Sequence, residues 1–295
     1  MKTYFIGLGG CGLQTVAELS KRLSKEKDYE KDYAFTYVDT DGYTKDDINK
    51  SGIVIQSSDF VDLGSTIPMA IYKEAEKTVG VNVNSKRFME WVITQEPGHM
   101  VLPNYPLTDG ATAQRMVGRT GLYNFYDAIY SELCSKINRF SEIEVDGNGR
   151  KDVDIWVITS SCGGTGSSMV LDILYMINRI GNSIVKGEPN VKLVLYMPQA
   201  FVESNVTNDN HKLNAYGCFS EINFFRSNFE NGKRQTFEPF AARPLPTGVN
   251  PIDFPLYHFL IPVCVENNFG SKMEIRQFYP TIAEMIYYLN MGGAR

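Results

Sequence analysis

The fold is decided by the stretch Ser160-Ser161-Cys162-Gly163-Gly164-Thr165-Gly166-Ser167-Ser168. An apolar run at 155–158 precedes it, and a helical pattern beginning at 169 follows it. This order predicts a buried strand, a turn rich in glycine and small hydroxyl residues, and then a helix. The first turn of a helix has unpaired N–H groups at the positive end of the helix dipole, and glycine lets an anion approach the backbone closely. The stretch therefore predicts a phosphate-binding turn.

A similar turn lies near residue 1, where a strand-like run at 3–6 is followed by Gly7-Leu8-Gly9-Gly10-Cys11-Gly12 and then by a helical pattern. Gly7, Gly9 and Gly12 fit the spacing G-x-G-x-x-G of dinucleotide-binding domains. No Gly-Lys-Ser/Thr follows, so this turn is not a P-loop. One such turn fits an NAD-binding Rossmann domain equally well. Two turns in one chain favour a single phosphate-bearing ligand that is held from two sides.

Apolar runs bounded by turn residues predict six buried strands, near 2–7, 34–39, 52–56, 153–160, 191–198 and 257–265. Helical patterns follow Gly12 and Gly166 and also occupy 117–140, 211–229 and 277–290. The alternation predicts an α/β fold of three layers, with a doubly wound, mainly parallel, Rossmann-like sheet. Ligands of such sheets bind at the carboxyl ends of the strands, where both glycine turns lie. Tyr216 and Phe219 are expected in the core.

Composition excludes several classes of protein. The 295 residues are 43% hydrophobic, which suffices for one large domain or two smaller ones. A formal net charge of −5 without a dense basic run disfavours nucleic acid as a partner. The five cysteines form no Cys-x-x-Cys pair and the three histidines have no metal-ligand spacing, which indicates a reduced, cytoplasmic protein without a metal site of its own. The sequence contains no signal peptide and no apolar segment of about 18 residues, so no membrane association is expected.

The two turns resemble those of the nucleotide-binding domain of the tubulin/FtsZ superfamily. Gly10-Cys11-Gly12-Leu13-Gln14 is similar to the first tubulin loop, Gln-Cys-Gly-Asn-Gln. The segment 162–168 resembles the superfamily signature Gly-Gly-Gly-Thr-Gly-Ser/Thr-Gly, from which Cys162 and Ser168 depart. Both departures are small residues, so the backbone of the turn stays open to a close approach.

Further matches to the superfamily follow in the same order along the chain. Val38-Asp39-Thr40-Asp41 resembles the FtsZ loop Val-Asn-Thr-Asp, and Gly110-Ala111 followed by Gly118-Arg119 resembles the loop around the γ-phosphate. Phe201 with Glu203 resembles the loop of the ribose contacts, and Asn267-Asn268 resembles the loop that reads guanine. The resemblance implies that the chain binds GTP or GDP, with Mg²⁺ held through the phosphates. The residues implied to bind the nucleotide are Gly9, Gly10, Cys11, Gly12, Gln14, Asp39, Asp41, Gly110, Ala111, Thr112, Ala113, Ser161, Cys162, Gly163, Gly164, Thr165, Gly166, Ser167, Glu203, Asn267 and Asn268.

The resemblance also implies a domain organisation and an activity. Residues 1–276 correspond to the GTP-binding domain, and 277–295 correspond to the start of the central helix. In the superfamily an acidic loop, Asn-x-Asp-x-x-Asp, follows that helix and positions the water that attacks the γ-phosphate in the next subunit. Neither that loop nor a second domain follows here. We therefore expect a truncated chain with weak or absent hydrolysis, from a filament-forming GTPase that associates head to tail.

Two alternatives remain open from the sequence. An NAD-dependent oxidoreductase would use Asp39 or Asp41 at the end of the second strand, but it leaves the second glycine turn without a role. A tubulin-like scaffold would bind the nucleotide without hydrolysing it. The catalytic residues are not identified by any of these readings.

Overall fold

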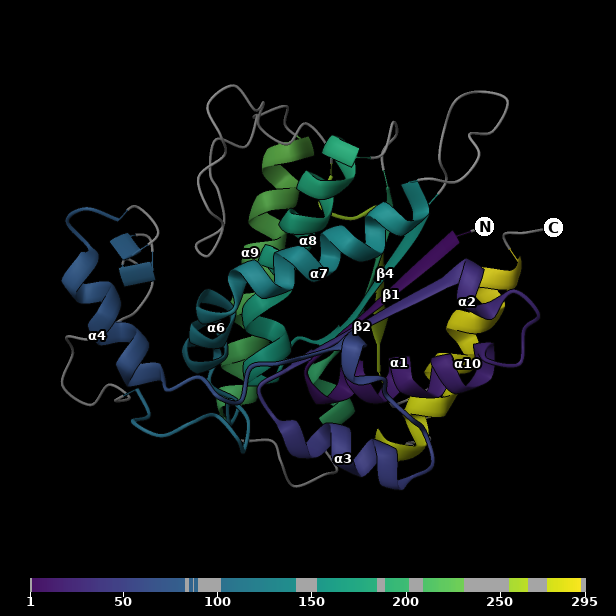
Figure 1. Cartoon of the computed structure of the whole chain (residues 1–295), viewed down its shortest axis with the longest axis horizontal. Coiled ribbons are helices and arrows are strands. Elements are labelled where there is room, and N and C mark those ends of the chain that lie inside the picture. Colours follow the sequence, from purple (N-terminus) through teal and green to yellow (C-terminus); the bar gives the residue numbers. More distant parts are fainter. Residues whose placement is uncertain are drawn as a thin grey trace.

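The apolar runs form one six-stranded sheet whose neighbouring strands are all parallel, in the order β3-β2-β1-β4-β5-β6 (Figure 1). The computed structural model describes residues 2–82, 85–86, 88–89, 102–141, 153–184, 189–201, 209–230, 255–264 and 275–292. The strands are β1 (Lys2–Leu8), β2 (Tyr33–Asp39), β3 (Phe60–Asp62), β4 (Val153–Ser160), β5 (Asn190–Tyr196) and β6 (Phe259–Val263). The order reverses beside β1, which confirms the predicted doubly wound α/β fold.

Helices connect the strands and cover the sheet. They are α1 (Gly9–Leu23), α2 (Tyr29–Asp32), α3 (Gly42–Lys50), α4 (Pro68–Thr78), α6 (Arg115–Asn124), α7 (Tyr126–Ser141), α8 (Gly164–Ile184), α9 (Asp209–Glu230) and α10 (Ile275–Gly292). Two short 3₁₀ turns, η1 (Ser57–Asp59) and η2 (Pro198–Phe201), precede β3 and follow β5. None of the helices in the described ranges combines the length and the apolar character that a membrane crossing requires.

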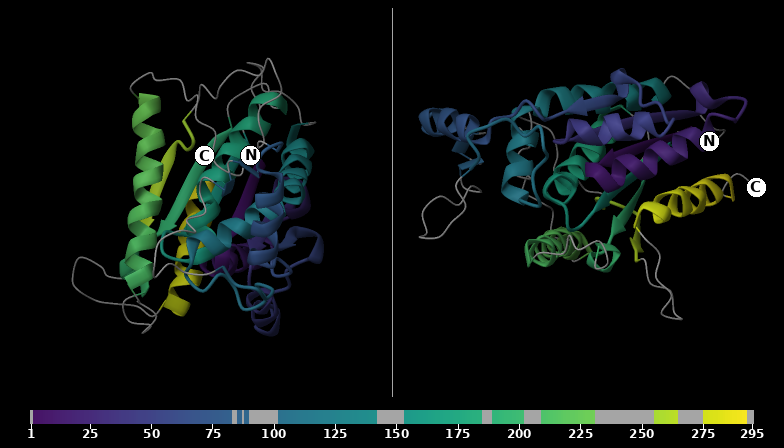
Figure 2. Two further views of the ribbon diagram at one scale, coloured as in Figure 1. Left: turned by 90° about the vertical axis from the view of Figure 1, so that its left-hand side faces the viewer. Right: turned by 90° about the horizontal axis from the view of Figure 1, so that it is seen from below.

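The sheet is packed on both faces. Phe5 and Trp156 belong to a core with α1 and α10, two helices that pack against each other and lie side by side in the right-hand view of Figure 2. Tyr4 and Val157 point the other way, into a core with α7, α8 and α9. This double coverage explains why β1, β2 and β4 are buried along their whole lengths and read as continuous apolar runs rather than alternating ones.

The third strand differs from the prediction. Residues 52–56 do not pair with the sheet, and β3 is a three-residue strand at 60–62 that pairs with the end of β2. The apolar run that predicted a strand is only partly buried, because Ile53 and Ile55 are buried whereas Val54 is exposed. The N–H of Ile53 donates to the Ile48 carbonyl and the N–H of Ile55 donates to Asn49 Oδ1, at 3.4 and 2.9 Å. The end of α3 therefore occupies the backbone donors that a strand would need.

Two helical expectations also need correction. The single helix expected at 117–140 is two helices, α6 and α7, separated at Phe125, whose φ of −104° and ψ of 17° leave the helical range. Phe219 packs against the core as expected, whereas Tyr216 is 76% exposed. Tyr216 lies one helical turn from Leu213, which is also exposed, so the two share an outward face of α9.

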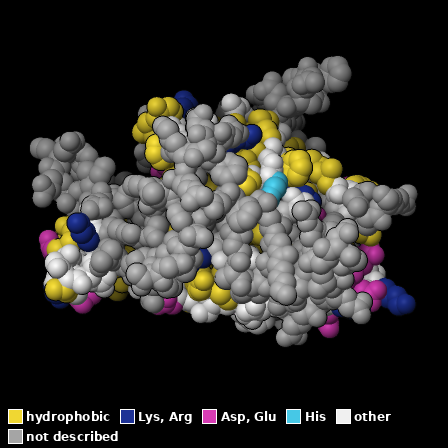
Figure 3. All heavy atoms as spheres, turned by 90° about the horizontal axis from the view of Figure 1, so that it is seen from above, with side chains coloured by type: hydrophobic (Ala, Val, Ile, Leu, Met, Phe, Trp, Pro, Cys, Tyr) yellow, Lys and Arg dark blue, Asp and Glu magenta, His cyan; other side chains and the backbone are white. Residues whose placement is uncertain are grey.

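One part of the chain stands apart from the sheet. Helix α4 lies to one side of the molecule, beyond α6 (Figure 1), and a small separate core that includes Ala75, Phe88 and Val117 joins the two helices. Figure 3 shows another face, seen from above, on which the described Lys and Arg side chains are scattered rather than gathered into one patch.

Candidate functional site

A pocket of about 370 Å³ lies at the carboxyl ends of the central strands, and both glycine turns line it. We call residues 7–12 the first glycine turn and residues 161–166 the second. The lining residues are Leu8, Gly9, Gly10, Cys11, Gln14, Asp39, Asp41, Thr44, Asp109, Gly110, Ala111, Thr112, Ala113, Ser160, Gly163, Gly164, Thr165, Gly166, Phe201, His211 and Tyr279. Most of the residues implied by the sequence therefore meet around one cavity.

The first glycine turn ends β1 and begins α1 at Gly9, whose φ is +67°. This left-handed conformation favours glycine. The residue before the helix, Leu8, offers no side-chain cap, so the first N–H groups of α1 are available to a ligand. Gly12 does not line the pocket, because its Cβ would lie 2.3 Å from the Ile158 carbonyl oxygen. Gly12 thus permits close packing of α1 on β4 rather than contact with the ligand.

The second glycine turn ends β4 and begins α8 at Gly164. A Cβ on Gly163 would meet no atom within 4 Å, so this residue faces open space in the pocket. A Cβ on Gly166 would lie 2.1 Å from Thr159 Oγ1, which makes Gly166 a packing position. A Cβ on Gly9 would lie 3.1 Å from the Gly166 nitrogen. The two turns are therefore in contact, and the starts of α1 and α8 lie side by side at one pocket.

Three of the hydroxyl and thiol groups in and next to the second glycine turn bond to the protein or are buried, and do not line the pocket. Ser161 donates to the Tyr196 carbonyl at 3.0 Å, and Ser167 donates to the Gly163 carbonyl. Cys162 is fully buried. These three predicted residues do not line the cavity. Thr165 does line it, and its hydroxyl is hydrogen-bonded to that of Thr40 at 2.6 Å.

Carboxylates line the side of the pocket next to β2. Asp39 is 2% exposed; its Oδ1 accepts the Thr40 N–H at 2.8 Å, and its Oδ2 has no hydrogen-bond partner among the described residues. Burial raises the pKa of Asp39 to about 7, although nearby N–H groups and the Thr165 hydroxyl oppose this shift. Asp41 accepts the Tyr43 N–H at 2.9 Å and so caps α3. Asp109, which the sequence did not single out, pairs with Asp41 through the backbone in an isolated antiparallel β-bridge.

The loop 110–113 crosses the same side of the pocket in an unusual conformation. Gly110, Thr112 and Ala113 have φ values of +81°, +46° and +56°. Residues other than glycine rarely adopt positive φ, and each such residue costs on the order of 1 kcal/mol or more. Such strain persists only where surrounding contacts impose it, and it occurs most often at ligand-binding sites.

Aromatic side chains also line the pocket. Tyr279, from the first half of α10, places its hydroxyl 3.5 Å from Cys11 Sγ. The rings of Phe201 and His211 are stacked, with centroids 6.2 Å apart. Burial lowers the pKa of His211, so it is neutral at pH 7. His211 and Tyr279 were missed from the sequence, because nothing in α9 or α10 marks these residues as neighbours of the glycine turns.

Other residues that the sequence singled out lie outside the pocket, or line it without being reactive. Arg119 is buried away from the pocket and forms an ion pair with Asp172 at 2.7 Å. Burial raises the pKa of Cys11 to about 12, so this thiol stays protonated and is a poor nucleophile. The expected ribose and guanine contacts, Glu203, Asn267 and Asn268, lie outside the described residues.

The pocket is suited to a polyanion that arrives with a cation. Two helix starts and a glycine-rich backbone supply N–H donors, yet none of the described lining residues is Lys or Arg. Three aspartates line the cavity, so a bare phosphate chain would be repelled. No cluster of three or more His, Cys, Asp or Glu ligands occurs in the described part of the chain.

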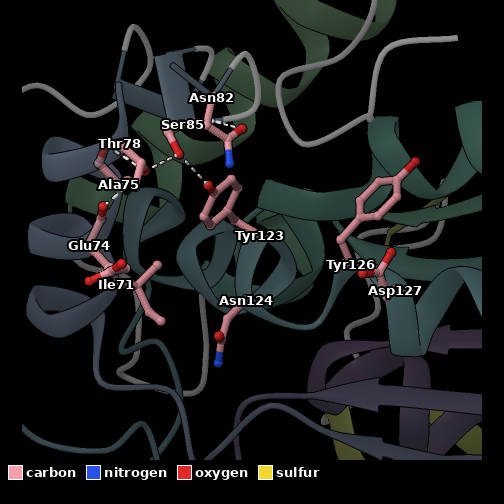
Figure 4. A pocket seen from close by; sticks show the side chains of 10 residues that line it. All are labelled: Ile71, Glu74, Ala75, Thr78, Asn82, Ser85, Tyr123, Asn124, Tyr126 and Asp127. Carbon is pink, nitrogen blue, oxygen red and sulfur yellow. Dashed lines mark hydrogen bonds between the residues drawn. The ribbon is translucent and has the colours of Figure 1, made fainter. Parts of the chain in front are cut away.

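A second cavity, of about 350 Å³, lies between α4 and the junction of α6 and α7 (Figure 4). Its hydroxyl groups bond to one another: Thr78 to Ser85 at 2.7 Å, and Ser85 to Tyr123 at 3.2 Å. Among the residues that the structure describes, the lining includes Glu74 and Asp127 but no glycine and no cationic side chain. This cavity is less suited to a phosphate than the pocket at the two helix starts.

Comparisons with known proteins agree with this geometry. A family model described as "Tubulin like" matches residues 4–260. No curated protein sequence matches the chain. Similar solved structures include CetZ from Methanosaeta thermophila strain DSM 6194, with a TM-score of 0.54 and 14% identity over 99% of this chain and 54% of that chain. TubZ of Clostridium botulinum phage c-st has a TM-score of 0.51 and 12% identity, over 97% and 58% of the two chains.

A third structure carries information on its ligand. CetZ2 from Haloferax volcanii, described as a GTPγS-bound protofilament, has a TM-score of 0.51 and 13% identity over 98% of this chain and 58% of that chain. The chain thus spans just over half the length of the structures that it resembles. At these identities the similarity shows a shared fold.

Proposed function

The chain belongs to the tubulin-like family, and from this premise we propose that its pocket binds a guanine nucleotide. The observation that carries the proposal is that both glycine turns, far apart in sequence, touch each other and line one cavity. Two similar structures from Haloferax volcanii, a GTPγS-bound CetZ2 protofilament and a GDP-bound CetZ1 monomer, support guanine nucleotides as the ligand class.

The lining suggests how the nucleotide would be oriented. The phosphates would lie against the N–H groups of Gly9, Gly10 and Gly163, where two helix starts favour negative charge. The sugar and base would extend toward Tyr279 and Phe201, because flat apolar rings suit a base better than a phosphate. Mg²⁺ bound to the phosphates would face Asp39 and Asp41 and neutralise part of the phosphate charge.

The proposal includes self-association. CetZ2 is described as a protofilament in its GTPγS-bound form, and we propose head-to-tail assembly of this chain on the same basis. Pelleting by ultracentrifugation should then be greater with GTPγS and Mg²⁺ than with GDP.

The first experiment identifies the ligand. The purified protein is denatured, and the released small molecules are separated and weighed by mass spectrometry; the expected result is GDP or GTP at close to one equivalent. Nucleotide-free protein is then titrated with GDP, ADP and NADH in the presence of Mg²⁺. Tight binding of GDP alone supports the proposal. Tight binding of NADH would instead support an oxidoreductase, and binding of none of the three would refute the proposed function.

A further inference from the structure

Helix α9 turns one polar face toward the pocket. Asn214, Gly217 and Glu221 are spaced three and four residues apart, so they lie along one side of the helix. Asn214 is only 8% exposed, whereas Leu213 and Tyr216, on the outward face, are largely exposed. The sequence identified none of these three polar-face residues as part of the site.

Asn214 links two separate parts of the pocket. Its side-chain amide nitrogen donates to the carbonyls of Ala113 and Cys162, both at 2.8 Å. Ala113 ends the loop 110–113, and Cys162 immediately precedes Gly163 in the second glycine turn. An asparagine amide has two N–H donors, so one side chain holds both segments at once. Because the contact is buried, its loss would leave two carbonyls without partners.

The loop 110–113 needs such a contact to keep its shape. Its left-handed residues are strained, and the chain must be held from outside to remain in this conformation. At one end the loop approaches β2, since a Cβ on Gly110 would lie 3.3 Å from the Asp41 Cβ. At the other end it is bound by Asn214 of α9. The loop thus spans one side of the pocket from β2 to α9.

A second contact fixes the residues that follow the loop. Arg115 donates to both carboxylate oxygens of Glu221, at 3.0 and 2.6 Å, and to the Ser167 carbonyl at 2.9 Å. Gly217 leaves room for this guanidinium, because a Cβ there would lie 2.5 Å from Arg115 Nη1. The polar face of α9 therefore packs against Arg115, the second residue after the loop 110–113.

We propose that Asn214 is a positioning residue that holds the loop 110–113 against the terminal phosphate of a bound nucleoside triphosphate. The inference rests on the proposed function. With the base on the side of Tyr279 and the inner phosphates at the glycine turns, the end of the phosphate chain lies toward Asp41 and the loop 110–113. The phosphate chain of a triphosphate extends further toward this loop than that of a diphosphate. Asn214 therefore sets the preference of the pocket for GTP over GDP without touching the nucleotide.

The test compares Asn214→Ala with Asn178→Ala. Asn178 is a matched control, because its amide also donates to two buried carbonyls, those of Leu174 and Leu256, but lies away from the pocket. Affinities for GDP and GTPγS are measured calorimetrically with Mg²⁺. Asn214→Ala should lower the affinity for GTPγS about tenfold, consistent with two lost hydrogen bonds, and the affinity for GDP less than about threefold. Asn178→Ala should leave the ratio of the two affinities unchanged.

Equal losses for the two nucleotides in Asn214→Ala, or no loss, would overturn the proposal. Should Asn214→Ala fail to fold, Asn214→Ser keeps a polar group but shortens its reach, and the same change in ratio is expected. Hydrogen exchange of the nucleotide-free protein gives a readout that does not depend on the ligand. Exchange in the peptide that contains 110–113 should accelerate in the Asn214 variant and not in Asn178→Ala. If the wild type binds no nucleotide, the proposed function fails, while unchanged exchange would refute the role of Asn214 separately.

Discussion

At Gly163 a substitution should change ligand binding while leaving the stability of the fold almost unchanged. Gly163→Ala is therefore the most informative substitution. The new Cβ would meet no atom within 4 Å, and the residue has no positive φ. Alanine is less favoured than glycine at the residue before a helix, which lowers stability. Alanine also restricts the conformations of the unfolded chain more than glycine does, which raises stability. These effects oppose each other, so we expect the free energy of unfolding to change by less than about 1 kcal/mol.

Nucleotide binding should respond much more strongly. The methyl group would occupy the open space beside the second glycine turn, where a phosphate oxygen would otherwise approach the backbone. Losing one hydrogen bond to a charged oxygen costs about 1.5–3 kcal/mol, which corresponds to a loss of affinity of roughly ten- to a hundredfold. Calorimetric titration with GDP and Mg²⁺ measures the affinity, and urea denaturation of the nucleotide-free protein measures the stability.

Two further glycines serve as controls. A Cβ on Gly80 also meets no atom within 4 Å, but Gly80 lies outside the pocket, so Gly80→Ala should bind GDP like the wild type. Gly166→Ala should lose stability, because its Cβ would lie 2.1 Å from Thr159 Oγ1 and 2.9 Å from the Leu8 carbonyl oxygen. If Gly163→Ala binds GDP as tightly as Gly80→Ala does, the second turn does not contact the phosphates and the reasoning is wrong.

Three other predictions concern charge and reactivity. Burial raises the pKa of Asp39 to about 7 in the folded protein, from 3.8 in the unfolded chain, so the contribution of Asp39 to the stability of the nucleotide-free protein should fall by about 4 kcal/mol as the pH rises between these values; in urea denaturation the wild type should lose this amount relative to Asp39→Asn. Arg119→Met should lower the free energy of unfolding by about 3–5 kcal/mol, because it leaves the buried Asp172 carboxylate without its partner; an unchanged denaturation midpoint would contradict this. Iodoacetamide at pH 8 should modify the exposed Cys264 and spare Cys11, whose pKa is about 12, and peptide mass spectrometry distinguishes the two sites.

The sequence predicted the framework of the site because that framework is local. A strand, a glycine turn and a helix follow one another within about thirty residues, and their order is visible as a change from an apolar run to a helical period. Two such units in one parallel sheet must end at the same edge, so Gly9 and Gly163 could be placed together without coordinates.

The separate roles of the glycines were not predictable in the same way. The spacing G-x-G-x-x-G treats Gly9 and Gly12 alike, but Gly12 faces the Ile158 carbonyl of another strand. The same limit applies to Ser161 and Ser167, whose hydroxyls bond to nearby carbonyls instead of facing the pocket. These roles depend on distances across the sheet, which no local pattern records.

Residues contributed by distant helices were also beyond the sequence patterns. Asn214 on α9 reads as an ordinary helix residue, and its importance comes from two carbonyls, at Ala113 and Cys162, that only the tertiary fold brings to it. The prediction of the third strand at 52–56 was wrong for a related reason, because hydrogen bonds from another segment decide the local structure. Ile53 and Ile55 belong to an apolar run of the kind that buried strands have, but their N–H groups bond to the end of α3.

A crystal structure of the protein with GTPγS and Mg²⁺ tests the central claim most directly. The account predicts phosphate oxygens within hydrogen-bond distance of backbone N–H groups in both the first and the second glycine turn. Phosphates that contact only one of these turns, or a nucleotide bound in the cavity beside α4, would contradict it.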